Sequence, residues 1–176
     1  MPYVNEVAES QADPHLREIY RNIEQNFGFL PHYFMAIGAM PHAIEGQLQL
    51  NGAVMGDSAL STVLKEQIGV VVSGINGSGY CMFIHMELLQ RFGVEKSLAR
   101  KLTTDYENAA VEPKVKALFR FAEKLTRKPY DIEDEDIEAV KKAGWDDAAV
   151  RETVLTVAYF NYVNRVSLGL GLVADF

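Results

Sequence analysis

The chain has 176 residues, 48% of them apolar, and its 17 basic and 24 acidic residues give a net charge of −7. This length and composition predict a single domain over residues 1–176 with a sizeable core. The acidic balance argues against nucleic acid and anionic membrane surfaces as partners. No apolar run is long enough to span a membrane, and the N-terminus lacks the regions of a signal peptide. With one cysteine, which excludes an internal disulfide, we expect a cytoplasmic protein acting on a small molecule.

Signals that start and stop helices recur through the first half of the chain. Asp13 is a typical N-cap and Pro14 suits the first helical position, so a helix is predicted from there to Gly28. The sequence Asn-Gly-Ser-Gly at 76–79 predicts a turn, and a helix over about 80–93 is expected to follow it. Residues of about 60–93 form the motif region, which contains the candidate functional residues. Other helices are expected to begin at Pro31, at Pro41, and at a cap that is either Ser58 or Ser61.

The second half of the chain shows the same helical pattern. The last predicted helix starts at an Asp146-Asp147 cap and carries apolar residues three and four positions apart. The acidic run at 131–138 is interpreted as a solvated helix start, because the ligand spacing of an EF-hand is absent. No alternating strand pattern occurs, so the sequence predicts an all-α fold of about eight helices. The remaining predicted helices cover residues 95–104, 113–128 and 133–143.

Cys81, the only cysteine, stands four residues before His85, so the two side chains share one face of the predicted helix. One interpretation is a small buried thiol beside a core histidine. The other is a nucleophile with a neighbouring base, since an imidazole and a helix N-terminus both favour the reactive thiolate. The position of Cys81 in the first turn after a glycine-bracketed loop favours the second interpretation.

Glu66 precedes this pair on another predicted helix and shares a face with Gly69 and Ser73. Two small residues on that face would let another helix approach closely. A carboxylate in such a crevice could orient His85 or receive its proton. A glutamate exposed at the surface fits the same spacing, and the sequence leaves both readings open.

Glu66, Ser78, Cys81 and His85 stand at the intervals of the motif E-x11-C-x2-C-x3-H. In this the chain resembles the superfamily of alkylhydroperoxidase D and carboxymuconolactone decarboxylase, with serine in place of the first cysteine. The segments at 27–55 and 143–171 look like the subgroup of peroxidase-related enzymes, and the resemblance extends over about residues 25–172.

The resemblance implies an AhpD-like helical bundle in which Cys81 attacks a peroxide and Glu66 and His85 form its proton relay. The family's first cysteine resolves the sulfenic acid, which Ser78 cannot do, so an external thiol reductant would be required. A serine engineered in place of a cysteine would give the same sequence. Ser78 can also cap the helix or donate to the thiolate, while Tyr80 can either bond into the site or merely pack.

We therefore expect a peroxidase-related thiol oxidoreductase with antioxidant activity toward a small peroxide. The alternatives are a decarboxylase-like lyase or isomerase that uses His85 as acid or base, and a non-catalytic, redox-sensing protein. The resemblance and the helices that are apolar on several faces predict a homo-oligomer. No cofactor is expected. Nor is a metal site, because three histidines lack ligand spacing to one another or to acidic partners, namely His15, His32 and His42.

Overall fold

The computed structural model describes residues 2–174, which contain nine α-helices and three short 3₁₀ helices but no strand. The all-α prediction is confirmed, and the helix expected at Pro31 is the five-residue α2. The α-helices are α1 (Pro14–Phe27), α2 (His32–Ala36), α3 (Pro41–Met55), α4 (Thr62–Ile75), α5 (Gly79–Arg91), α6 (Lys96–Thr104), α7 (Pro113–Arg127), α8 (Asp134–Lys142) and α9 (Asp147–Gly169). The 3₁₀ helices are Glu9–Gln11, Tyr106–Asn108 and Pro129–Asp131.

Local capping chemistry sets the predicted helix ends. The Asp13 carboxylate accepts the Leu16 N–H at 2.8 Å, and α1 ends at Gly28, whose φ is 81°. Of the two candidate serines before α4, the cap is Ser61, whose hydroxyl accepts the Leu64 N–H at 3.2 Å.

The second half of the chain follows the same rules. Asp146 caps α9 by accepting the Ala149 N–H at 2.8 Å. In the acidic run, Glu133 and Asp136 form a capping box at the start of α8, as the helix-start interpretation predicted.

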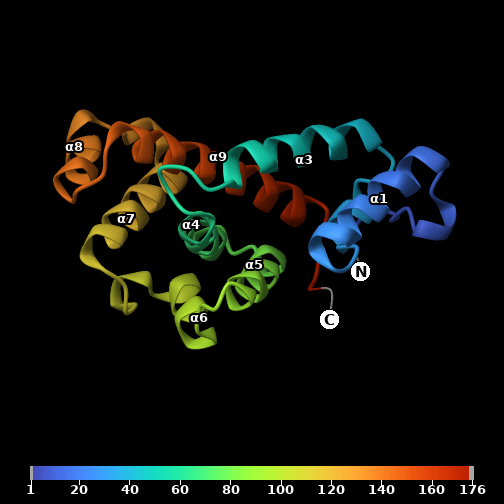
Figure 1. Ribbon diagram of the computed structural model, residues 1–176, viewed down its shortest axis with the longest axis horizontal. Helices are drawn as coiled ribbons and strands as arrows, with labels where there is room; N and C mark the ends of the chain where they lie inside the picture. Colours follow the sequence, from blue (N-terminus) through green and yellow to red (C-terminus); the bar gives the residue numbers. More distant parts are fainter. Residues whose placement is uncertain (1, 175–176) are drawn as a thin grey trace.

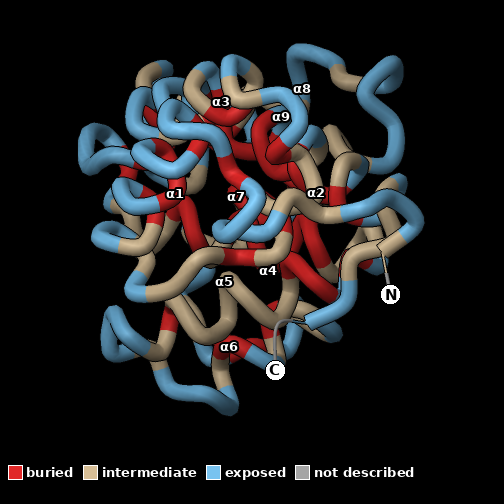
Figure 2. Tube along the Cα trace, turned by 90° about the vertical axis from the view of Figure 1, so that its right-hand side faces the viewer, coloured by how far each residue is buried: buried red, intermediate tan, exposed pale blue. Residues whose placement is uncertain are grey.

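Helix α4 lies at the centre of the fold, packed against α5, α6, α7 and α9 (Figure 1). Three consecutive valines, at 70, 71 and 72, are buried in it, so this helix has no solvent face over that turn. Figure 2 shows the buried segments inside a shell of exposed loops and helix faces. The core joins residues of all the longer helices, including Ile23, Ile44, Ile68, Leu89, Leu102, Phe119 and Phe160.

Two glycines let neighbouring helices approach α4 closely. A Cβ atom on Gly69 would lie 2.0 Å from the Phe160 ring of α9, and one on Gly74 would lie 2.1 Å from the Thr103 carbonyl oxygen of α6. Both distances are far below van der Waals contact. The close packing expected along the Gly69 face of α4 is therefore present.

None of the described helices combines the length and apolar character needed to cross a bilayer. Helix α9 exposes three large apolar side chains, Leu155, Tyr162 and Leu168, each between 45% and 53% accessible. The homo-oligomer stays a prediction, for which these side chains are the natural contact points.

Candidate active site

The centre of the candidate site is a carboxylate–imidazole pair between α4 and α5. Glu66 lies on α4 and is only 4% exposed, so the reading of this residue as a surface glutamate is wrong. Its Oε2 atom is 2.7 Å from Nδ1 of His85 on α5. This contact orients the imidazole and directs its Nε2 atom away from the carboxylate.

The opposite side of the imidazole is fixed by α9. The rings of His85 and Phe160 meet edge to face, with centroids 4.6 Å apart and planes inclined by 66°. Phe160 in turn occupies the space that the missing side chain of Gly69 leaves. Close packing of α9 on α4 thus determines where the His85 ring can lie.

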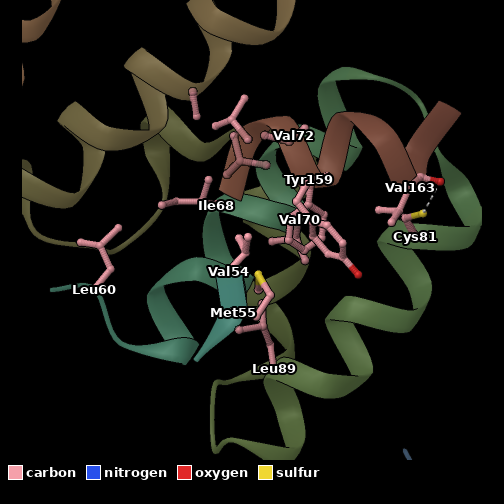
Figure 3. Packing of buried hydrophobic residues seen from close by; sticks show 14 of the residues in the cluster. Val54, Met55, Leu60, Ile68, Val70, Val72, Cys81, Leu89, Tyr159 and Val163 are labelled. Atoms are coloured by element: carbon pink, nitrogen blue, oxygen red, sulfur yellow. Dashed lines mark hydrogen bonds between the residues drawn. The ribbon is translucent and has the colours of Figure 1, made fainter. Parts of the chain in front are cut away.

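Cys81 is 3% exposed and also faces α9, but its sulfur meets different partners. Its Sγ atom lies 3.3 Å from the Ser167 hydroxyl oxygen and 4.0 Å from the Val163 carbonyl oxygen (Figure 3). Ser167 itself donates to the same carbonyl at 2.9 Å. No hydrogen bond joins Cys81 to His85 in the described part of the chain. The two residues share a helix face, as the spacing predicts, while their polar atoms point to separate partners.

Ser78 occupies the N-cap position of α5 but does not cap the helix with its side chain. Its ψ of 87° departs from the values of 171° at Asp13 and 151° at Ser61, so its hydroxyl is not directed at the first-turn N–H groups. The capping interpretation is wrong for this reason. Ser78 is fully buried, and within residues 2–174 its Oγ atom has no hydrogen-bond partner, Cys81 included.

Tyr80 ties α5 to α2. Its hydroxyl oxygen accepts the backbone N–H of Tyr33 at 3.1 Å, and its side chain is buried. This bond spans 47 residues and fixes the entry of the chain into α5. The two readings of Tyr80, packing and a bond into the site, both stay predictions.

No sequence pattern predicts a set of hydrogen-bonded side chains near the site, of which Tyr33, Gln47 and Tyr159 are buried and Asn51 is half-buried. The Tyr33 hydroxyl donates to Gln47 at 2.7 Å, and the amide of Asn51 donates to the Tyr159 hydroxyl at 3.0 Å. Burial is the main cause that raises the pKa of Tyr159 to about 12, with Glu66 contributing. Tyr33, Gln47 and Asn51 lie in the segment that carries the family resemblance, but no local spacing marks them as a group.

A cavity of about 540 Å³ opens between α1, α3, α4 and α5. Glu66 is part of its wall, whereas Cys81 and His85 are not. Its lining is mainly apolar, with a few amides and the charged side chains of Glu87 and Arg91. The walls include Ile23, Phe27, Leu48, Met55, Ile84, Leu88, Asn22, Asn26 and Asn51.

The histidines outside the motif do have acidic partners, so the expectation that they lack them is wrong. Glu45 contacts His42 at 3.0 Å and His15 at 3.4 Å, while Glu6 contacts His32 at 2.8 Å. Glu45 follows His42 by three positions, one helical turn, and only folding brings His15 of α1 to the same place.

The comparisons with known proteins agree with this architecture. The sequence profile of the carboxymuconolactone decarboxylase family matches residues 41–124. An alkylhydroperoxidase AhpD core structure, an uncharacterized peroxidase-related protein from Ralstonia eutropha JMP134, is 21% identical with a TM-score of 0.90. It covers 98% of this chain and 91% of its own. No curated protein matches the chain.

Two further structures share the fold. A peroxidase-related protein from Silicibacter sp. TM1040 is 25% identical with a TM-score of 0.85, covering 92% of this chain and 87% of its own. A debrominase variant in complex with 2,3,4-tribromopyrrole is 21% identical with a TM-score of 0.81, covering 96% of this chain and 89% of its own. The family match and the shared fold together support the AhpD-like carboxymuconolactone decarboxylase superfamily.

Proposed function

We propose that this protein is a thiol-dependent, peroxidase-related oxidoreductase in which Cys81 attacks a small peroxide. The observation that carries the proposal is the contact of buried Glu66 with half-buried His85, whose oxygen and nitrogen atoms lie 2.7 Å apart. His85 stands one helical turn from Cys81, the only cysteine. A carboxylate-oriented imidazole on the same helix face as a thiol supplies the groups that nucleophilic and acid–base chemistry use.

In the proposed first step, the Cys81 thiolate attacks the terminal oxygen of the peroxide. The S–O bond forms as the O–O bond breaks, and the leaving alkoxide takes a proton from the imidazolium of His85. Glu66 stabilises that imidazolium, so it is the positioning residue of the pair. The products are an alcohol and the sulfenic acid of Cys81.

The second step depends on Ser78. Because this position carries a hydroxyl, no thiol in the chain can resolve the sulfenic acid. Two molecules of an external thiol restore Cys81: the first displaces water and forms a mixed disulfide, and the second releases a symmetric disulfide. Without that reductant, further peroxide converts the sulfenic acid to sulfinic acid.

The cavity favours a second candidate, a lyase or isomerase that uses His85 and Glu66 for acid–base chemistry on an organic substrate. Glu66 lines a largely apolar cavity of about 540 Å³, which is far larger than a small peroxide needs. Cys81 does not reach that cavity. In this candidate the thiol is dispensable, Glu66 exchanges the proton with the substrate in the cavity, and His85, its hydrogen-bond partner, acts as the acid or base behind it.

Peroxide consumption with a dithiol reductant, followed in parallel by mass spectrometry, separates the two candidates. For the oxidoreductase, Cys81 gains about 16 Da under limiting peroxide and about 32 Da under excess. Cys81→Ser abolishes turnover, and Glu66→Gln slows it roughly 100-fold. A chain that consumes no peroxide and keeps its mass contradicts the proposal. Conversion of a small lactone or carboxylate that survives Cys81→Ser and fails in His85→Gln would establish the second candidate.

A further inference from the structure

Two helices far from the candidate active site bring three potential metal ligands together. His15 is the second residue of α1, and His42 is the second residue of α3, which packs against α1 (Figure 1). Glu45 follows His42 by one turn of α3. All three side chains are accessible, with exposed fractions of 48%, 89% and 38% for His15, His42 and Glu45.

The spacing of the ligand atoms suits a single cation. Nε2 of His15 lies 3.4 Å from one oxygen of Glu45, and Nδ1 of His42 lies 3.0 Å from the other. One ligand atom of each residue falls within 4.8 Å of the others. Ligands about 2.0–2.1 Å from a tetrahedral ion are about 3.3 Å apart. The two His–Glu separations are close to this value, and the exposed imidazoles of His15 and His42 can turn toward a shared ion.

Ordinary surface ion pairing explains this arrangement poorly. An exposed pair between residues three apart on a helix contributes little stability, and one carboxylate here serves two imidazoles. The two rings are 5.7 Å apart and inclined by 48°, so they do not stack on each other.

We propose that His15, His42 and Glu45 form a binding site for one divalent transition-metal ion of the zinc class. Two imidazoles and one carboxylate select Zn²⁺, Co²⁺, Ni²⁺ or Cu²⁺ over Mg²⁺ and Ca²⁺, which prefer all-oxygen ligands. Water completes the coordination, since three protein ligands leave positions open and the site faces solvent.

A cation at this place would clamp α1 to α3. Farther along, the same two helices form walls of the 540 Å³ cavity through Asn22, Asn26, Leu48 and Asn51. Binding of an ion that bridges the helices stabilises the folded chain, because the unfolded chain does not hold the three ligands together. The proposal is independent of the peroxidase proposal, since none of its residues touches Glu66, Cys81 or His85.

The test is calorimetric titration of Zn²⁺ into chelator-treated full chain that carries no polyhistidine tag. We expect one ion per chain and a Tm that rises with the logarithm of free Zn²⁺ concentration. His15→Ala and His42→Ala should each weaken binding by at least about tenfold. The double variant His15→Ala/Glu45→Gln should lose both the heat of binding and the Tm shift.

Two controls make the result specific. His32→Ala removes the histidine of the other surface His–Glu pair and should leave Zn²⁺ affinity unchanged. Cys81→Ser tests whether the thiol is the ligand instead. The proposal fails if the wild-type chain binds no Zn²⁺ up to about 1 mM, if His15→Ala binds like the wild type, or if Cys81→Ser removes the binding. Circular dichroism shows that each variant is folded, which these exposed positions should allow.

Discussion

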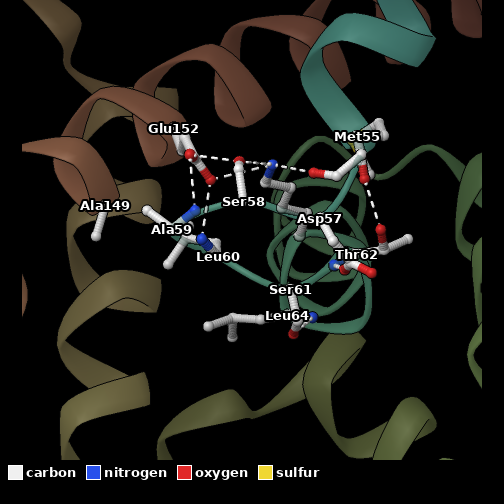
Figure 4. A network of polar contacts seen from close by, with 12 residues as sticks. Met55, Asp57, Ser58, Ala59, Leu60, Ser61, Thr62, Leu64, Ala149 and Glu152 are labelled. Atoms are coloured by element: carbon white, nitrogen blue, oxygen red, sulfur yellow. Dashed lines mark hydrogen bonds and ion pairs between the residues drawn. The ribbon is translucent and has the colours of Figure 1, made fainter.

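Lys65 and Glu66 are adjacent in α4 and both are buried, yet their surroundings differ. The Lys65 ammonium lies 2.6 Å from the Gly56 carbonyl oxygen, 3.1 Å from Glu152 and 3.3 Å from the Ser58 hydroxyl. All three of its protons therefore have acceptors. The Glu152 carboxylate also has several donors, because it accepts bonds from Ser58 and from the N–H groups of Ala59 and Leu60 (Figure 4).

Glu66, in contrast, has one hydrogen-bond partner among the described residues, His85, and lines a cavity. Burying a carboxylate costs free energy that a single bond offsets only in part. The buried cation thus belongs to a saturated network that joins the α3–α4 loop to α9, while the buried anion keeps capacity for a ligand. A charge with every partner in place indicates a structural role, and one left partly unsatisfied beside a cavity indicates a functional role.

The largest expected effect is the loss of stability when Lys65 is replaced. Lys65→Met keeps the volume but leaves Glu152 without its cation, and we expect a loss of about 3 kcal/mol in the free energy of unfolding. Urea titration measures it. The matched variant Glu66→Gln should change stability by less than about 1 kcal/mol, because the amide keeps its shape and its contact with His85. Equal losses in the two variants would remove the distinction between the two residues.

The next effect concerns the packing that holds His85. Gly69→Ala places a methyl group 2.0 Å from Phe160, which is fully buried and cannot swing away. We expect a loss of about 2 kcal/mol, despite the better helix propensity of alanine. Gly46→Ala is the control, since nothing lies within 4 Å of its new methyl, and it should be neutral or stabilising. Thermal unfolding of both variants tests the pair, and a stabilised Gly69→Ala would contradict the packing argument.

Low pH should weaken the hydrogen-bond network around Lys65, because it protonates the Glu152 carboxylate. Burial raises the pKa of this carboxyl, but bonds from Ser58, the Leu60 N–H, Lys65 and the Ala59 N–H outweigh it and lower the pKa from 4.5 to about 2. The unfolded chain therefore binds the proton first, so this contribution is present above about pH 4.5 and is lost as the pH falls toward 2. Unfolding free energies of wild type and Glu152→Gln should converge over that range, whereas a constant difference would count against the network.

The local rules predicted the parts of the molecule that depend on neighbours in sequence. Caps at Asp13 and Asp146 follow from side chains within three residues, and the approach of α9 follows from the small residue Gly69 on a helix face. The contact of Glu66 with His85 was one of two readings of Glu66 that the sequence left open, because the helical pattern places each residue on a defined helix face.

No local sequence pattern predicts the contacts between segments that are distant in the chain. Ser167 meets Cys81 from 86 residues away, and Gln47 meets Tyr33 through an arrangement of helices that no spacing reveals. His15 and His42 show the same limit, since each reads alone as a surface residue. The direction of the Ser78 hydroxyl depends on a backbone angle at the turn, which the residue type alone does not predict.

The smallest expected effect on stability, and the most informative about chemistry, is that of Ser78→Cys. The Ser78 hydroxyl is buried without a partner, so exchanging oxygen for sulfur removes no bond, and we expect a change below about 1 kcal/mol. Positions 78 and 81 are the N-cap and the third residue of α5, and side chains three apart on a helix are about 5–6 Å apart at Cβ. A small rotation of the first turn brings that spacing within disulfide range.

If Cys81 is the attacking thiol, peroxide should convert Ser78→Cys to an internal disulfide instead of sulfinic acid. A thiol held beside the sulfenic acid competes far better than one in solution. Mass spectrometry should then show a loss of about 2 Da in place of a gain of about 32 Da. Turnover with a dithiol reductant should rise, and Cys81→Ser in the same background should abolish it. A variant that still proceeds to sulfinic acid would mean that the two side chains cannot meet. A variant that peroxide leaves unchanged would favour acid–base chemistry by Glu66 and His85, for which the open carboxylate beside the cavity is already in place.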